Sequence, residues 1–294
     1  MKRTTRSVLI ALGSLVIISF LSPYGLAQKD KKEVPTTSLM TRSTTRHETA
    51  RLAYGATLTL SGAPLGSISI EGWDKSEIDV TAIIELQAPT AADLDRLALV
   101  NSFVIDQDAN HIRILTTGTH DREFMKRTAK NFPKNLIGLP WKIDFHIKIP
   151  PSTDLEIDAG TGPIVLSGVE GALRLNAMSS DASLWLTGGI VSVLIQRGTL
   201  NLRIPSRGWR GLGADFKVAA GNLNVELVPG FSADVNASVL RFGQIKNSFE
   251  DLRPREDGGS TDRLLRARAG SGGATLEFTV GDGTIEIKPE GKTQ

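Results

Sequence analysis

The sequence predicts an all-β protein in which a repetitive, β-solenoid-like (β-helix-like) stack of short strands follows a β-rich N-terminal part with one or two short helices. Units of a glycine followed by alternating apolar residues recur along the chain. They are GSISIEGWD (66–74), GPIVLSG (162–168), GTLNL (198–202), GNLNVEL (221–227), GATLEF (273–278) and GTIEIK (283–288). A period of two indicates half-buried strands, and glycine suits tight turns between them. The composition agrees, because 29 glycines and only 5% aromatic residues favour a turn-rich core of Ile, Leu and Val.

The first 27 residues have the pattern of a secretory signal peptide. A basic start, MKRTTR, precedes an apolar run from Val8 to Leu21 and small residues up to Ala27. We predict cleavage after Ala27 and a periplasmic, extracellular or cell-surface location. The alternative is a membrane anchor, although the run is shorter than the roughly 20 residues that span a bilayer. No later segment is long and apolar enough to span one, so no transmembrane segment is expected after cleavage.

Charge and cysteine content exclude several classes. The formal net charge is +2, but three basic residues lie in the leader, so the rest of the chain is slightly negative and lacks the basic footprint of a nucleic-acid binder. The chain has no cysteine, which excludes a lipoprotein anchor and disulfides. Residues 28–48 are polar without periodicity and are predicted to be a flexible linker; a basic arm that touches lipid or cell wall is the alternative.

The next segment, 49–150, is predicted to be a β-rich region with helical insertions. Alternation in ATLTLSG, GSISIEGW and SEIDVTAIIEL (76–86) predicts three strands of a meander. Thr90 to Phe103 changes to helical spacing, and Thr90 with Asp93 forms a start like a capping box. Alternation on both sides of a DAN turn in 103–115 predicts a hairpin.

A basic segment follows within 117–140. Arg122, Lys126 and Lys130 have helical i,i+4 spacing, and Arg127 adds a further cation. One interpretation is a solvated surface helix. The other is a contact between these four residues and an anionic polymer such as lipopolysaccharide, teichoic acid or phospholipid.

Pro150 and Pro151 mark the predicted boundary of a second domain, residues 151–290. Superimposing its strands predicts inward pairs at intervals near 20 residues, as in a solenoid whose coils bury one another's apolar faces. These pairs are Ile164 with Leu166, Leu184 with Leu186, Leu200 with Leu202, and Leu223 with Val225. Because the intervals are irregular, a β-sandwich remains the alternative. Asp282-Gly283 has the chemistry of a hairpin turn.

The order of these motifs resembles the bacterial putative-adhesin family. The resemblance is carried by GSISIEGWD, the alternating strands and helix, the strand ending in IKIPP, and the serial glycine units that close with GDGTIEIK. It covers about Leu52 to Lys288 and implies an exported domain of unknown function with an adhesin-head-like β-solenoid. It brings no catalytic residues, and the basic insertion at 120–135 is not part of the pattern.

The search for chemistry predicts no enzyme, cofactor or metal site. The four histidines are scattered, and His120 beside Asp121 lacks the third group of a triad. Asp154, Glu156 and Asp158 share one side of a strand, which suits calcium or a sugar-cleaving pair but equally describes a solvent face. A polysaccharide-active enzyme therefore ranks below a binding or scaffold module.

The remaining candidate is a ligand surface around Trp185. If Leu184 and Leu186 face inward, Trp185 faces outward, with Val165, Asn201 and Asn224 at equivalent positions of adjacent coils. An indole beside amides can stack on a sugar ring or anchor a protein partner. The alternative is that the preceding domain or the loop around Trp209 covers Trp185. We expect a non-catalytic envelope module with a glycan or protein partner, or alternatively an exported sensor.

Overall fold

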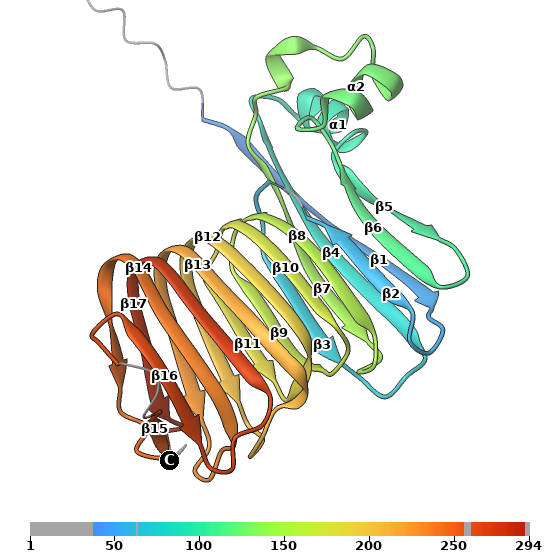
Figure 1. Cartoon of the computed structure of the whole chain (residues 1–294). Helices are drawn as coiled ribbons and strands as arrows, with labels where there is room; N and C mark the ends of the chain where they lie inside the picture. The colour runs from blue at the N-terminus through green and yellow to red at the C-terminus, as the bar shows by residue number, and fades with distance from the viewer. Residues whose placement is uncertain (1–37, 63, 256–259, 292–294) are drawn as a thin grey trace, which may run out of the picture. The chain divides into compact units, whose positions relative to one another are not determined.

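The computed structural model describes residues 38–62, 64–255 and 260–291, which lie in one compact unit. The predicted signal peptide and residues 28–37 lie outside the described residues. The all-β prediction is confirmed (Figure 1). The elements are β1 (Met40–Arg51), β2 (Thr57–Ser61), β3 (Ile68–Gly72), β4 (Glu77–Ala88), α1 (Ala91–Ala98), β5 (Ser102–Gln107), β6 (His111–Thr117), α2 (Arg122–Thr128), η1 (Lys134–Leu136), β7 (Trp141–Ile149), β8 (Asp154–Thr161), β9 (Ile164–Val169), β10 (Leu173–Ser179), β11 (Ala182–Leu186), β12 (Gly188–Ile204), β13 (Arg210–Leu227), β14 (Ala233–Asn247), β15 (Leu252–Pro254), β16 (Leu264–Ala269) and β17 (Thr275–Pro289).

Strand pairing arranges these strands as two ladders. The first ladder runs β5-β6-β2-β8-β10 and continues through the N-terminal halves of β12, β13, β17 and β14. The second runs β1-β4-β7-β3-β9-β11 and continues through the C-terminal halves of the same four strands. The long strands belong to both ladders and bend from one to the other, so the two are connected along β12 to β17.

Parallel pairing dominates the second half of the chain. In the second ladder Ile164 pairs with Ala182, Ala182 with Leu200, and Leu200 with Leu223. The last strand, β17, lies between β13 and β14, and the antiparallel strand β16 covers the N-terminal half of β14. Inward residues of both ladders form one buried cluster that includes every predicted inward pair. The inward assignment is therefore confirmed.

Glycines stack at the corner where the chain passes from the first ladder to the second. A Cβ at Gly221 (φ +142°) would lie 1.8 Å from the carbonyl oxygen of Gly198, and one at Gly283 would lie 1.7 Å from that of Gly221. No side chain fits such a distance, so glycine allows adjacent corners to approach. The prediction of a hairpin turn at Asp282-Gly283 is wrong. These two residues form a bend within β17, which stays parallel to β13.

Two other predictions on the N-terminal half are wrong. A strand, β1, begins at Met40 inside the predicted linker; it lacks alternation because nearly all its side chains are exposed and backbone bonds to β4 hold it. The predicted meander does not form, because β2 pairs in parallel with β6 and β8, while β3 pairs with β7 and β9. Alternation reports which face is buried but not which strand is the partner.

The helical predictions are closer to the structure. The Thr90 hydroxyl accepts a hydrogen bond from the Asp93 amide and caps α1, as expected. The hairpin β5–β6 also forms. The ladders are continuous across Pro150 and Pro151, since β2 pairs with β8 and β3 with β9. The division into two domains at this point stays a prediction.

Candidate functional site

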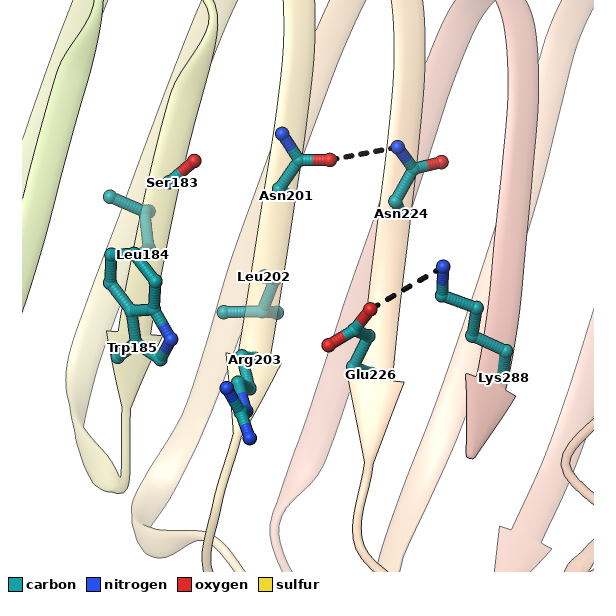
Figure 2. A pocket seen from close by; sticks show the side chains of 9 residues that line it. All are labelled: Ser183, Leu184, Trp185, Asn201, Leu202, Arg203, Asn224, Glu226 and Lys288. Atoms are coloured by element: carbon teal, nitrogen blue, oxygen red, sulfur yellow. Dashed lines mark hydrogen bonds and ion pairs between the residues drawn. The ribbon is translucent and has the colours of Figure 1, made fainter. Parts of the chain in front are cut away.

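Trp185 lies in a shallow groove on the outward side of the second ladder. The groove has a volume of about 170 Å³ and is formed by β11, β12, β13 and β17 (Figure 2). Its lining is Ser183, Leu184, Trp185, Asn201, Leu202, Arg203, Asn224, Glu226 and Lys288. Trp185 is 36% exposed, so it is not covered as the alternative expectation held. The loop residue Trp209 is instead buried, and its indole nitrogen donates to the Gly189 carbonyl at 3.0 Å.

The strand register around Trp185 is shifted by two residues from the predicted register. Trp185 pairs with Ser167 and Arg203, whereas Val165 and Asn201 pair with Ser183. Asn201 and Asn224 pair with each other and still line the same groove. The error arises at Ser180, which occupies the corner that glycine occupies in neighbouring rungs, so the strand start was misplaced.

The corrected register reveals three charged residues that the sequence analysis missed. Arg203, Glu226 and Lys288 follow Trp185 across the strands, as Figure 2 shows. Aligning the strands by their corner residues, instead of matching leucines, would have found Arg203, which follows Gly198 by five residues as Trp185 follows Ser180. Glu226 and Lys288 form an ion pair at 3.4 Å, and Arg203 Nε donates to Glu290 at 2.6 Å. The groove therefore joins an indole to fixed charges of both signs.

Asn201 and Asn224 are hydrogen-bonded to each other, and in the described part of the chain each keeps one amide group free for a ligand. Asn224 Nδ2 donates to Asn201 Oδ1 at 2.8 Å. Among the described residues, Asn201 Nδ2 and Asn224 Oδ1 have no hydrogen-bond partner, so one donor and one acceptor are available beside the indole. This arrangement can hydrogen-bond a hydroxyl-rich ligand.

The three carboxylates of β8 are each engaged by a neighbour. Asp154 accepts from the Ala172 amide at 2.7 Å, Asp158 from Asn176 Nδ2 at 2.9 Å, and Glu156 from Thr59 Oγ1 at 3.3 Å. These contacts link adjacent strands, as polar ladders on a solvent face do. Within the described ranges, no group of three or more His, Asp or Glu side chains is placed to hold a metal ion.

The predicted anionic-polymer contacts lie on and just after α2, and all four are exposed. Lys126 pairs with Glu123 at 2.7 Å, and Arg127 Nε donates to the Glu123 carbonyl. The helix ends at Thr128, so the i,i+4 row does not extend to Lys130 as a helix face. Arg127 and Lys130 instead line an open hollow of about 770 Å³ with Arg96 and Leu99, which the sequence analysis missed.

His120 and Asp121 each make a local structural contact. Asp121 caps α2 by accepting from the amides of Glu123 and Phe124. The His120 ring packs against Trp141, with centroids 5.3 Å apart, and desolvation lowers the pKa of His120 while the nearby Asp121 opposes the shift. Both residues therefore have structural roles.

Fold and groove together define an all-β protein whose ladders are parallel from β8 onward except at β15 and β16, and which presents a polar groove around one exposed indole. In the part of the chain that the structure describes, no helix has both the length and the apolar character needed to cross a membrane.

The chain is similar to solved structures named as a putative cell adhesion protein or as putative adhesins. They include a putative cell adhesion protein from Clostridium sporogenes (12% identity, TM-score 0.46, 84% of this chain and 100% of that chain covered). Two others are putative adhesins from Bacteroides fragilis (10%, 0.35, 84% and 97%) and Parabacteroides merdae (11%, 0.25, 83% and 95%). Structures bearing the name of the family that the sequence resembles are thus among its neighbours. No protein-family model and no curated protein matches the chain.

Proposed function

We propose that the protein is an exported, non-catalytic binding or scaffold module of the bacterial envelope, and that it binds a carbohydrate at the Trp185 groove. The observation that carries the proposal is the indole of Trp185, 36% exposed, beside the free Nδ2 of Asn201 and the free Oδ1 of Asn224. A sugar ring presents C–H groups to an aromatic face and hydroxyls to amides, and this groove offers both partners.

We further infer that the parallel strands from β8 to β17 are coils of a β-solenoid. The supporting observation is the in-register advance from Ile164 to Ala182, Leu200 and Leu223, together with the glycine stack at one corner. Its outward face carries bonds between neighbouring strands, from Asn224 to Asn201 and from Lys288 to Glu226, which limit the motion of these side chains. Such limited motion reduces the entropy lost when a ligand binds.

The binding proposal is tested by replacing the indole. We expect the chain from Gln28 to retain defined glycans on an array, and Trp185→Ala to lower the affinity for them at least about tenfold, since an exposed aromatic anchor is the main contact. Ile190→Ala is the matched control, because Ile190 is an apolar side chain, 62% exposed, that does not line the groove.

Three outcomes would contradict the proposal. Equal glycan retention by Trp185→Ala and Ile190→Ala would mean that the groove is not the glycan-binding site. Turnover of a polysaccharide would favour the enzyme, and capture of one envelope protein without any glycan would favour the sensor. Iodide quenching gives an independent check: Trp185→Phe should lower the quenchable fraction of the emission, because Trp185 is 36% exposed, whereas Trp73 and Trp141 are partly buried and Trp209 is only 7% exposed.

Export is a separate prediction that rests on residues 1–27. We expect the protein to appear outside the cytoplasm with Gln28 as its first residue. N-terminal sequencing of fractionated cells measures this directly. Retention of Met1 in a membrane fraction would contradict cleavage and favour the anchor alternative.

A further inference from the structure

The hollow between α1 and the segment after α2 combines apolar and basic side chains. It is lined by Arg96, Leu99, Val100, Arg127, Thr128, Ala129, Lys130, Asn131, Phe132 and Pro133. Leu99, at the C-terminal cap of α1, is 83% exposed, which is unusual for a leucine beside a buried helix face. The proposed glycan site lies elsewhere, on β11 to β17, so this hollow has no role in the function proposed above.

The charge of the hollow is one-sided. No acidic residue lines it, and Arg127 and Lys130 form no ion pair with any described residue. Arg96 is paired with Asp93 at 3.2 Å, and Lys126 on α2 with Glu123. Two unpaired cations beside an exposed leucine distinguish this surface from an ordinary solvated helix, whose cations have nearby acids.

The walls of the hollow are held in place by the core. Leu94 and Leu97 of α1 are buried, as are Met125 of α2 and Leu136 of η1. The buried Asn101 links the two parts, since its Nδ2 donates to the Leu97 carbonyl and its Oδ1 accepts from the Thr119 amide at 2.9 Å. These contacts anchor α1 and η1 on the core and tie α1 to the segment that precedes α2.

The hollow lies at the end of the fold where the described chain begins. Met40 pairs with Ala88, which precedes α1, and Arg42 forms an ion pair with Asp95 of α1 at 2.7 Å. Figure 1 shows α1 and α2 together at the end of the fold where β1 begins.

We propose that this hollow docks the protein on the surface of an anionic lipid bilayer. The guanidinium of Arg127 and the ammonium of Lys130 contact lipid phosphates, and Leu99 enters the boundary between headgroups and acyl chains. Cations attract anionic headgroups, and an exposed leucine gains by leaving water, so the two contributions add on an amphiphilic surface. A soluble anionic polymer would use the cations and leave Leu99 in water.

The test is vesicle co-sedimentation with the chain from Gln28, which retains the whole compact unit. We expect binding to vesicles of equal parts phosphatidylglycerol and phosphatidylcholine, and little binding to phosphatidylcholine alone. Arg127→Gln with Lys130→Gln should weaken binding about 30-fold, at about fivefold for each cation lost. Leu99→Ser should weaken it about tenfold without any change of charge.

Matched controls distinguish binding at this hollow from non-specific binding through any exposed cation or apolar side chain. Leu212→Ser removes a leucine that is 86% exposed, and Lys246→Gln an exposed lysine of β14; neither lines the hollow, so both should bind as the unaltered chain does. All five positions are exposed, and unchanged melting temperatures will verify folding. Equal losses in the control variants would overturn the proposal. So would loss of binding with the two cations but none with Leu99→Ser, which would indicate an anionic polymer, or no binding to anionic vesicles at all.

Discussion

Replacing Leu200 with aspartate is expected to prevent stable folding. Leu200 has no exposed surface and pairs with Ala182 on one side and Leu223 on the other, in the middle of the second ladder. The variant loses a packed leucine and buries a charge that has no partner, at a combined cost of at least about 4 kcal/mol. Domains of this size are stable by only about 5–15 kcal/mol. Denaturant titration followed by circular dichroism measures the loss.

The neighbouring residue provides the control for charge. Asn201 is exposed, and an aspartate there keeps the oxygen that accepts from Asn224 Nδ2. Asn201→Asp should therefore change the free energy of unfolding by no more than about 0.5 kcal/mol, as for ordinary surface substitutions. If both variants have the same midpoint, the burial of Leu200 does not stabilise the fold.

The second large effect is expected at the glycine corner. Gly221→Ala places a Cβ 1.8 Å from the Gly198 carbonyl oxygen, at a φ of +142° that L-residues rarely adopt. Relief requires the β12 and β13 corners to separate, and we expect a loss of more than about 3 kcal/mol from strain and lost packing together. The melting temperature should fall well below that of the unaltered protein.

Two other glycines separate the causes of this effect. Gly273 has nearly the same φ, +141°, but nothing lies within 4 Å of its Cβ position, so Gly273→Ala reports the backbone strain alone, about 1–3 kcal/mol. Gly138 has neither constraint, and Gly138→Ala should be close to neutral. If Gly221→Ala is no more destabilising than Gly273→Ala, close approach of the corners does not stabilise the fold.

The sequence determined by itself which residues are buried. Leu184, Leu200 and Leu223 face the core as alternation predicted, because the side-chain period of two is a local property of an extended backbone. The cap at Thr90 was equally local, since the hydroxyl bonds an amide three residues away. The same locality made the hairpin β5–β6 predictable.

Only the tertiary structure decided which strands pair. Alternation is unchanged when a strand slides by two residues, so nothing in the apolar pattern distinguished Leu200 from Leu202 as the neighbour of Leu184. Arg203 was therefore missed as the neighbour of Trp185. The strand β1 was missed for a related reason: its stability comes from backbone bonds to β4, which no side-chain pattern records.

In the basic hollow, too, the sequence determined some features and the tertiary structure decided others. Arg127 and Lys130 were recognised as a charged segment from the sequence, but Leu99 and Arg96 come from a helix some thirty residues earlier in the chain. Leu97 and Leu136 belong to the buried core, and Asn101 bonds both Leu97 and Thr119, so these contacts bring the segments together. The sequence thus determined the composition of the surface, and packing decided which of its parts are neighbours, because contacts between distant segments depend on the fold as a whole.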